Sequence, residues 1–513
     1  MKLRVPQALR ADPLLAGGMA LLLVAACVPL FVTPFLPFVD LPQHSASAAL
    51  LLDSLAGRGV ARELFSVDWA PVPYWTQQVL LGVAQLLGGP LFAAKAVCAL
   101  AIAALPLASL RLCLALDRSP RLALGSFLLV WDYSLYWGWS AFLLGMALAV
   151  YALAVVLEAD TARQAARAVP LTLLIALTHP QAVAFLLVTA GALLVVRRPF
   201  WPALRAHAVG TSGAALAFVP WVTSRLGPEQ GSAGPGAWPP RFEWVPLAQK
   251  LTRLFENSLE NGPGPFLSAA SAVAFLLVLL GPLALARLPA LPSAARSAGR
   301  AWVVVGACFT AYLALPMTIV AGQLSHWGTY PRFATWALLS LSFVPRPNLD
   351  GRRVLALGPA VAVALALDAG VFLQLRGFAR LTRPLEQVAA ALPAGTRVLP
   401  LVYQGFDPSL RHPSLHHLHG YLVALRSVYD PHLFDNPNRP LRYRVERRLP
   451  APPWNDPARL DPAQLGFYDY VLVQGLERDP FAQDANLGRL VRPVTEAGMW
   501  RLYQVAPELR TGR

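Results

Sequence analysis

The chain has 513 residues, of which 56% are hydrophobic and only 14% are charged. A water-soluble fold of this size needs more polar residues to cover its surface. The composition therefore excludes a soluble globular protein and indicates a polytopic membrane protein. The formal net charge is +15, from 43 Lys and Arg against 28 Asp and Glu. Many basic residues lie in short links between apolar segments, as in cytoplasmic loops, so we expect a lipid bilayer and no nucleic acid as partner.

The N-terminal region predicts a retained first span. Residues 1–12 contain three basic residues, and the apolar segment 14–35 that follows is long enough to cross a bilayer. The basic flank places the N-terminus in the cytoplasm. Asp40 and His44 come directly after this span, close to three prolines, Pro34, Pro37 and Pro42. We therefore expect both side chains at a membrane surface.

The rest of the first outer loop, 37–90, predicts two helices that lie at the membrane surface. Residues 45–55 are too short and too closely followed by charges to span the bilayer. A second apolar helix begins near the Pro73-Tyr74-Trp75 cluster and ends at about Leu87, before Gly88-Gly89-Pro90. Its length of about 15 residues favours a juxtamembrane helix over a span.

Lys and Arg in the short links orient the remaining apolar segments. They predict an all-α bundle of about eleven transmembrane helices within residues 1–375, with a second long outer loop at 223–265. The expected spans are 14–35, 91–110, 122–131, 142–157, 169–177, 182–196, 208–222, 266–285, 302–321, 334–344 and 354–375.

Residues 376–513 have a different composition, with more charged, Pro and His residues and no long apolar segment. A helix is expected at 385–392, and strands at 396–403, 468–474 and 502–505. The tail is therefore predicted to be a small α/β domain, and the span count places it outside the cytoplasm. The Pro- and Arg-rich stretch 431–457 is expected to be an ordered loop over a site.

The predicted topology brings scarce ionisable residues from distant segments to one side of the membrane. Polar groups at such positions are costly in a membrane protein and commonly mark function. The residues gathered on this side are Asp40, His44, Asp132, His179, His326 and Arg332.

The order of these parts resembles the C-type (GT-C) integral membrane glycosyltransferases. An acidic residue follows the first span, two juxtamembrane helices come next, the second opening with Pro73-Tyr74-Trp75, and a helical bundle and an outer soluble domain complete the chain. The chain is similar to the mannosyl and aminoarabinose transferases of this superfamily, which depend on polyprenyl-phosphate sugars. The resemblance implies a bacterial inner-membrane enzyme that moves a sugar from a polyprenyl-phosphate carrier to a lipid, glycan or protein acceptor.

One departure from the family concerns its first-loop acids. Many members carry an Asp-Glu or Asp-x-Asp pair, whereas Asp40 is followed by Leu41-Pro42-Gln43-His44. The missing second carboxylate leaves the use of a divalent cation open. No other cofactor is expected, and no metal site is predicted, because the four cysteines lie inside apolar segments without metal-like spacing.

Transfer of a sugar from a lipid phosphate needs a base for the acceptor and positive charge for the departing phosphate. Asp40 is the candidate base by analogy with the family; alternatively it caps the helix that begins at Leu41. His44, one helical turn further on, could orient Asp40 or contact a phosphate. Arg332 is the candidate phosphate ligand, with a snorkelling interfacial arginine as the alternative.

Further candidate contacts to phosphate or substrate carry less specific signals. Asp132 could be a second acid or a plain loop residue, and Asp368 could be structural or could face a cavity. In the tail, His412, His416 and His419 would share one face if the stretch 412–419 were helical, although Pro413 argues against such a helix. This cluster could line the site entrance, could be plain surface, or could bind a metal, although no Cys or carboxylate beside it completes a zinc set. The remaining candidates for phosphate or substrate binding are His326, His179, Lys95, Tyr74, His416 and His419.

Two other functions remain open from the sequence. A transporter or flippase of a lipid-linked substrate would place ionisable groups near mid-membrane, as Asp368 is placed, but would also be expected to show inverted repeats, and none is visible. A non-catalytic protein of envelope polysaccharide assembly would lack a cavity that joins Asp40, Arg332 and the tail.

Overall fold

The computed structural model describes residues 4–197, 199–226, 240–259, 265–285, 292–321, 324–345, 349, 351–434, 439–444, 448–475 and 477–510. The protein is a helical membrane protein with a few small sheets. Four helical segments in this part of the chain are long and apolar enough to cross a membrane: Pro13–Phe31, Trp75–Ala115, Ser140–Glu158 and Arg353–Ala391. Shorter apolar helices pack beside them.

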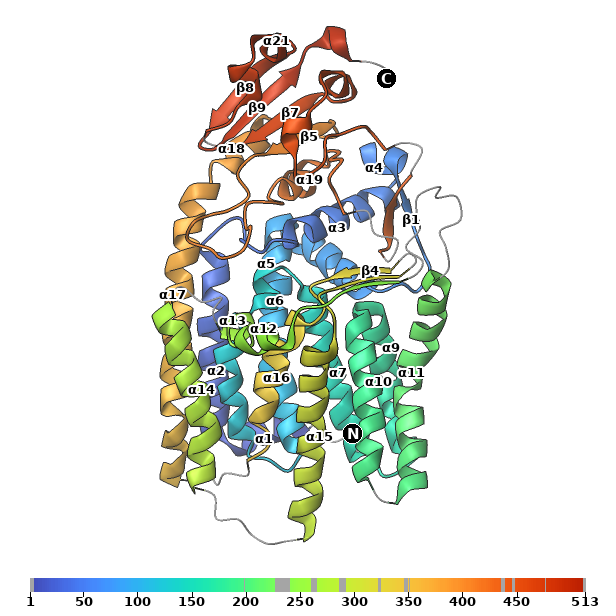
Figure 1. Ribbon diagram of the computed structural model, residues 1–513, viewed down its shortest axis with the longest axis vertical. Helices are drawn as coiled ribbons and strands as arrows, with labels where there is room; N and C mark the ends of the chain where they lie inside the picture. Colours follow the sequence, from blue (N-terminus) through green and yellow to red (C-terminus); the bar gives the residue numbers. More distant parts are fainter. Residues whose placement is uncertain are drawn as a thin grey trace.

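The long helices stand side by side, and a smaller domain sits on one end of the bundle (Figure 1). The helices of the bundle and of its connecting loops are α1 (Arg4–Ala11), α2 (Pro13–Cys27), η1 (Val28–Phe31), α3 (Leu41–Leu55), α4 (Gly59–Leu64), α5 (Trp75–Ala115), η2 (Pro120–Leu129), α6 (Tyr133–Tyr136), α7 (Ser140–Glu158), α8 (Ala162–Ala165), η3 (Ala166–Ala168), α9 (Val169–Thr178), α10 (Pro180–Leu193), η4 (Leu194–Val196), α11 (Phe200–Leu226), α12 (Leu247–Thr252), α13 (Glu256–Leu259), α14 (Pro265–Leu285), α15 (Pro292–Ala314), η5 (Pro331–Phe333), α16 (Ala334–Leu341), η6 (Gly351–Leu357) and α17 (Gly358–Thr382).

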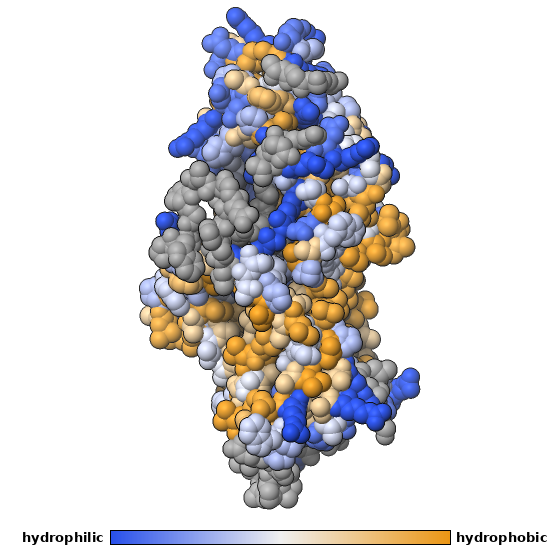
Figure 2. All heavy atoms as spheres, turned by 90° about the vertical axis from the view of Figure 1, so that its right-hand side faces the viewer, coloured by the Kyte–Doolittle hydropathy of each residue, from blue (hydrophilic) through white to orange (hydrophobic). Residues whose placement is uncertain are grey.

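The surface is divided as expected for a membrane protein. On the face drawn in Figure 2, hydrophobic residues form a belt across the middle of the molecule, and hydrophilic residues are concentrated toward both ends. Leu86, Leu216 and Phe266 are among the large apolar side chains that are more than 70% exposed. Exposure of this kind is favourable only against lipid.

The first long loop forms the two helices that the sequence predicts. Helix α3 lies across the end of the bundle, and nearly all of it is buried against α5 and α19 (Gly420–Arg426) (Figure 1). Helix α5 has a break at Gly89, where φ is 79° and ψ is 174°, directly before Pro90. Only glycine takes this conformation without strain, so the Gly-Gly-Pro sequence separates the loop-side half of α5 from the half within the bundle.

One predicted span ends earlier than expected. We predicted a helix over 302–321, whereas α15 ends at Ala314 and the chain turns into strand β3 (Thr318–Ala321). Pro316 lacks the N–H that a helix needs, and β-branched residues follow it. Strand β3 pairs with β2 (Arg241–Glu243) and β4 (Leu324–Trp327) at the domain-side end of the bundle. Of the predicted outer loop 223–265, residues 227–239 and 260–264 lie outside the described residues.

The tail contains a four-stranded sheet in the order β5–β7–β9–β8. The predicted helix at 385–392 and the three predicted strands all have counterparts here, and β8 was missed. Strands β5 and β7 are parallel, whereas β7 and β8 are each antiparallel to β9. The tail elements are α18 (Leu385–Ala391), β5 (Val398–Val402), α19, β6 (Leu441–Tyr443), η8 (Pro457–Arg459), η9 (Pro462–Phe467), β7 (Tyr470–Gln474), α20 (Pro480–Gln483), α21 (Ala485–Gly488), β8 (Val491–Ala497), β9 (Trp500–Val505) and η10 (Pro507–Leu509).

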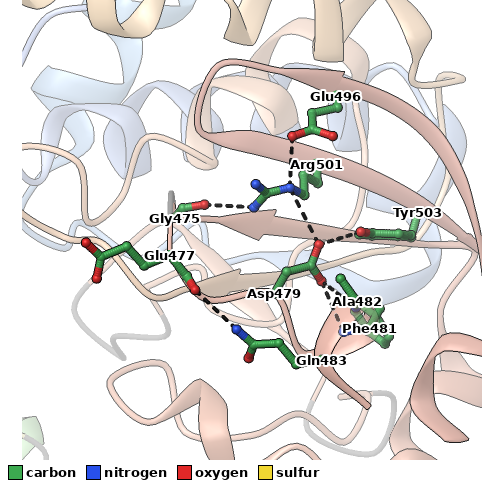
Figure 3. Close-up of polar contacts among 9 residues, drawn as sticks. All are labelled: Gly475, Glu477, Asp479, Phe481, Ala482, Gln483, Glu496, Arg501 and Tyr503. Carbon is green, nitrogen blue, oxygen red and sulfur yellow. Dashed lines mark hydrogen bonds and ion pairs between the residues drawn. The ribbon is translucent and has the colours of Figure 1, made fainter. Parts of the chain in front are cut away.

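A polar network fastens one edge of this sheet (Figure 3). Asp479 accepts hydrogen bonds from the backbone N–H groups of Phe481 at 3.0 Å and Ala482 at 3.4 Å, and so caps α20. The Tyr503 hydroxyl donates to Asp479 at 2.5 Å. Arg501 lies 3.5 Å from Asp479 and 3.1 Å from Glu496. The charged groups of this network find their partners within the protein, which is typical of a structural role.

Besides the packing of α19 on α3, two contacts between the tail and the first outer loop bear on Arg439. Strand β6 pairs antiparallel with β1 (Phe65–Val67) of the first outer loop, with Phe65 opposite Tyr443. Gln43 of α3 is hydrogen-bonded to the chain around His432, accepting from the Phe434 backbone N–H at 3.2 Å and donating to the His432 carbonyl at 3.3 Å. The segment that contains Arg439 is therefore held between two anchors over the end of the bundle.

Candidate active site

Asp40 lies at the start of α3 without capping it. It occupies the N-cap position, but its carboxylate makes no bond to the helix end. Instead the indole N–H of Trp139 donates to Asp40 Oδ2 at 3.1 Å. Burial raises the pKa of Asp40 to about 6, against the opposing influence of Arg439, Arg332 and the Trp139 hydrogen bond. A carboxyl group with this pKa is ionised at neutral pH and remains basic enough to accept a proton.

The backbone around Asp40 is clamped by the turn before α7. The Val39 N–H donates to the Tyr136 carbonyl at 3.0 Å, and the Asp40 N–H donates to the Trp137 carbonyl at 3.1 Å. Gly138, with φ of +77°, closes this turn, and a Cβ added there would lie 2.6 Å from the Leu41 nitrogen. The glycine is thus required both by its conformation and by the close approach of the Asp40 segment.

Arg332 comes from η5 and is held from several sides. Its Nε donates to the Gly328 carbonyl at 3.1 Å, and an Nη2 proton goes to the Trp327 carbonyl at 3.0 Å. Nη1 donates to His179 Nε2 at 3.2 Å. The guanidinium carbon lies 3.7 Å from the centre of the Trp139 ring, a cation–π contact. The side chain is therefore fixed in place while donor protons on Nη1 and Nη2 remain for a ligand.

Arg439 is the functional candidate that the sequence did not identify. It lies two residues before β6 and is only 8% exposed. Its guanidinium packs over the rings of Phe434, at 4.7 Å, and Tyr74, at 5.5 Å. Within the described part of the chain, its Nε and Nη1 have no hydrogen-bond partner. A buried cation with unmatched donors is costly unless an anion joins it.

Three histidines from different segments surround the arginines. The ring of His44 stacks on Tyr74 at 6.4 Å, and the rings of His179 and His326 lie 5.7 Å apart. Burial, with Arg332 and Arg439 nearby, lowers the pKa of His326 to about 3 and that of His44 well below its usual value. Both are therefore neutral at physiological pH and can contribute hydrogen bonds but no charge.

These side chains line one cavity of about 310 Å³. Asp40, Arg332 and the tail residue Arg439 all face it. The charged groups of its lining are two guanidinium groups and one carboxylate, so the cavity carries a net positive charge when Asp40 is ionised. This charge is complementary to an anionic ligand. The complete lining is Asp40, His44, Tyr74, Trp139, Ala141, Phe142, His179, Ser325, His326, Trp327, Arg332, Phe434 and Arg439.

An apolar groove of about 360 Å³ adjoins the cavity at His326, which lines both. The groove runs between α10, α11 and α15 and is lined by side chains such as Phe185, Val188 and Trp221. These helices belong to the hydrophobic belt (Figures 1 and 2). A positively charged cavity next to an apolar groove suits an amphipathic molecule with an anionic head group and a hydrocarbon chain.

Four of the predicted site residues lie elsewhere. Asp132 is 1% exposed and is used locally, because it accepts from the Leu135 N–H at 2.9 Å and from the Thr335 hydroxyl at 2.6 Å. Lys95 lies over the Phe31 ring at 5.9 Å, on α5. His416 packs against Trp454, with ring centres 4.6 Å apart, and His419 is paired with Asp430.

The His-rich stretch 412–419 therefore does not form one helical face. Its members point to different neighbours, and His412 lies among Tyr133, Tyr136 and Trp137. His417 contributes indirectly, since its Nδ1 lies 3.3 Å from the Gln43 amide that holds the loop near Arg439. The stretch packs the tail onto the bundle.

The donor set of the cavity does not fit a divalent cation. Mg²⁺ and Ca²⁺ favour several oxygen ligands, and Asp40 is the one carboxylate in the lining. No group of three or more His, Cys, Asp or Glu suited to a metal ion occurs among the residues that the structure describes. The positive charge in the cavity comes from the side chains of Arg332 and Arg439.

The sequence matches no protein-family model and no curated protein. Among solved structures, the chain is similar to ArnT from Cupriavidus metallidurans bound to undecaprenyl phosphate, with 13% identity, a TM-score of 0.52, and coverage of 97% of this chain and 99% of that chain. The apo form of the same protein gives 14% identity, a TM-score of 0.53 and the same coverage. The chain has the fold of a C-type membrane glycosyltransferase.

The GT-C resemblance noted in the sequence is thus confirmed at the level of the fold, over nearly the whole length of both chains. A further similar structure is the arabinofuranosyltransferase AftD from Mycobacteria, with 16% identity, a TM-score of 0.49, and coverage of 95% of this chain and 40% of that chain. Within the GT-C fold of the present chain, the acidic residue after the first span and the tail loop meet at one cavity.

Proposed function

We propose that the protein is a membrane glycosyltransferase that moves a sugar from a polyprenyl-phosphate carrier to an acceptor at the domain-side surface of the membrane. The observation that carries this proposal is the pairing of two buried arginines and one carboxylate in a cavity that opens onto an apolar groove. The arginines suit the phosphate, the groove suits the isoprenoid chain, and Asp40 suits the acceptor hydroxyl. The similar ArnT structure contains undecaprenyl phosphate.

In the proposed reaction the acceptor oxygen attacks the anomeric carbon of the sugar while Asp40 takes the hydroxyl proton. The bond between that carbon and the phosphate oxygen breaks, and the polyprenyl phosphate leaves with the electron pair. Arg332 and Arg439 stabilise the negative charge that develops on the leaving phosphate. Attack opposite the leaving group inverts the configuration at the anomeric carbon.

The proposal includes a location and an orientation. We infer an inner-membrane protein of a bacterium, with the N-terminus in the cytoplasm and the tail domain outside. In support, α7 starts at Ser140, directly after Trp139, which is bonded to Asp40, and runs 19 residues, about 28 Å, to Glu158. Arg163 and Arg167 follow this helix. Basic links favour the cytoplasmic side, so the cavity, at the other end, faces outward.

Asp368 was the main support for the transporter alternative, and its position in the structure weakens that support. The Trp131 indole donates to Asp368 Oδ1 at 2.9 Å, and Asp368 does not line the cavity or the adjoining groove. The non-catalytic alternative predicts that no cavity joins Asp40, Arg332 and the tail. In the structure these residues line one cavity together, which argues against this alternative.

The decisive experiment compares the wild-type protein with Asp40→Asn in membranes supplied with labelled polyprenyl-phosphate sugars. Loss of the base should lower transfer by about 10² to 10⁴-fold. Binding of the unglycosylated polyprenyl phosphate should persist, because Asn keeps the shape of the side chain and the arginines remain. Transfer by Asp40→Asn at the wild-type rate would remove Asp40 from the mechanism. Accumulation of the intact labelled donor inside vesicles, without a covalent product, would support transport instead.

A further inference from the structure

Three arginines mark the domain-side end of the last long helix, α17. Arg376, Arg380 and Arg383 are spaced by four and three residues, so they lie on one face of the helix. All three are exposed. In the described part of the chain, none of their side chains is hydrogen-bonded or paired with an acidic side chain. Their charges are thus available to a group outside the protein.

The distribution of basic residues along the bundle does not account for these arginines. Basic links gather at the opposite end, where Arg163 and Arg167 follow α7. Arginines at the domain-side end run against that bias and need another reason to be there. The surface of a bilayer leaflet supplies one, since lipid phosphates lie at this level.

The arginines border a pocket that meets a mostly apolar pocket further along α17. Together with Val32 and Gln387 they line a pocket of about 710 Å³. Phe372 lines this pocket and also a second one, of about 420 Å³, between α17 and α2. Helices α17 and α2 lie side by side at one edge of the bundle (Figure 1). The two pockets adjoin at Phe372, and we refer to them together as the α17 groove, whose upper part is basic.

The lower pocket has the character and the length of a lipid-chain site. On α17 it extends from Leu365 to Leu373, about 12 Å at 1.5 Å per residue. This matches most of one leaflet of a hydrocarbon core about 30 Å thick. Its walls are apolar apart from Asp368, which is 5% exposed and lies at its lower part. One oxygen of Asp368 is hydrogen-bonded to Trp131, and the other is buried without a partner among the described residues.

We propose that this groove is a binding site for an anionic phospholipid of the leaflet on the domain side. The phosphate lies among Arg376, Arg380 and Arg383, and an acyl chain descends past Phe372 along α2. The site is separate from the proposed catalytic chamber, because the two share no lining residue. The bound lipid would hold the upper end of α17, from which the tail domain continues at α18.

The test uses the full-length protein in detergent, titrated with phosphatidylglycerol or with zwitterionic phosphatidylethanolamine, and native mass spectrometry to measure the fraction with one lipid bound. The wild-type protein should bind phosphatidylglycerol more tightly. Each arginine close to an anionic lipid surface contributes roughly fivefold to the affinity. The variant Arg376→Gln/Arg380→Gln/Arg383→Gln should therefore bind phosphatidylglycerol on the order of a hundredfold more weakly. Binding of phosphatidylethanolamine should change little.

A matched control removes the same charge from the tail surface. Arg478→Gln/Arg489→Gln/Arg492→Gln changes three exposed arginines outside the belt and should leave the affinity for phosphatidylglycerol unchanged. A second variant, Ala369→Trp, fills the lower pocket without altering charge and should also weaken binding. Equal affinity of the wild-type protein for the two lipids would overturn the proposal, as would wild-type affinity in both the triple α17 variant and Ala369→Trp. These lipid measurements need no transfer activity, so they stand apart from the test of Asp40.

Discussion

Two clusters of charged residues in this molecule are organised in opposite ways. At the edge of the tail sheet, Asp479 caps α20 and is joined by Tyr503 and Arg501, so its charge is matched within the protein (Figure 3). In the cavity, Asp40 receives one hydrogen bond from Trp139, and Arg439 has Nε and Nη1 without a partner among the described residues. A matched network stabilises a fold, whereas a buried set with unmatched charge is poised for a ligand.

The largest effect that tests this difference between the two clusters is expected from replacing the cavity arginines. Arg332→Gln and Arg439→Gln should each lower transfer by about 10² to 10³-fold, because each removes a donor for the charge on the leaving phosphate. Arg439→Gln should leave the melting temperature unchanged or raise it, since it relieves an uncompensated buried charge. Transfer rates with labelled lipid donor and thermal unfolding in detergent measure the two effects. Full activity of both variants would contradict the assignment of the phosphate site.

The pH dependence of transfer sharpens the assignment of Asp40. Its pKa is raised to about 6 by burial, so the carboxylate that accepts a proton is lost as the pH falls through 6. One pH unit below a pKa near 6, about a tenth of the groups are ionised, so transfer at pH 5 should be about tenfold slower than at pH 7. The rate should be level above pH 7. A rate that is independent of pH between 5 and 7 would speak against Asp40 as the base.

A smaller effect is expected from the anchor of the tail loop. Gln43→Leu removes the hydrogen bonds to Phe434 and His432 that hold the segment near Arg439. Each hydrogen bond contributes about 1 kcal/mol, and if Arg439 loses positioning worth one such bond, transfer should fall by about fivefold. In the Arg439→Gln background the same change should add little, because the residue that Gln43 positions is already gone. Additive losses in the double variant would show that Gln43 acts by another route.

The tail network provides the opposite control, with the smallest effect on transfer. Asp479→Ala removes the cap of α20 and the partner of Tyr503 and Arg501. We expect a loss of stability of about 2 kcal/mol, mainly from the lost cap and the unpaired donors. Transfer below the unfolding temperature should stay at the wild-type level. A large loss of transfer in a folded Asp479→Ala protein would give this edge of the sheet a role in the reaction.

Much of the cavity could be predicted from the sequence because its groups follow from topology. Counting basic links placed Asp40, His179, His326 and Arg332 at one end of the bundle, and all four line the chamber together with His44 and Tyr74. The count of spans and the sidedness of the tail stay predictions. The strand β3, where a span was expected, follows from Pro316 and its β-branched neighbours.

What could not be predicted depends on contacts between distant segments. Arg439 stands in a stretch with many arginines, and the pairing of β6 with β1, together with the Gln43 anchor, brings it over Tyr74. Asp132 looked like the other loop acids, but a local helix start and Thr335 occupy its carboxylate. The sequence shows which groups are scarce, whereas burial and partners decide which of them remain open to a ligand.

Gly138 bears on how this protein can diverge. Any side chain at that position would press on the peptide that carries Asp40, and the left-handed backbone there adds a second barrier. Residue 138 should therefore tolerate no substitution, whereas its neighbours can vary. In a saturation library selected for transfer, glycine should be retained at position 138 as strictly as aspartate at position 40. Homologues that have exchanged this glycine should then also have rebuilt the loop or abandoned the acid.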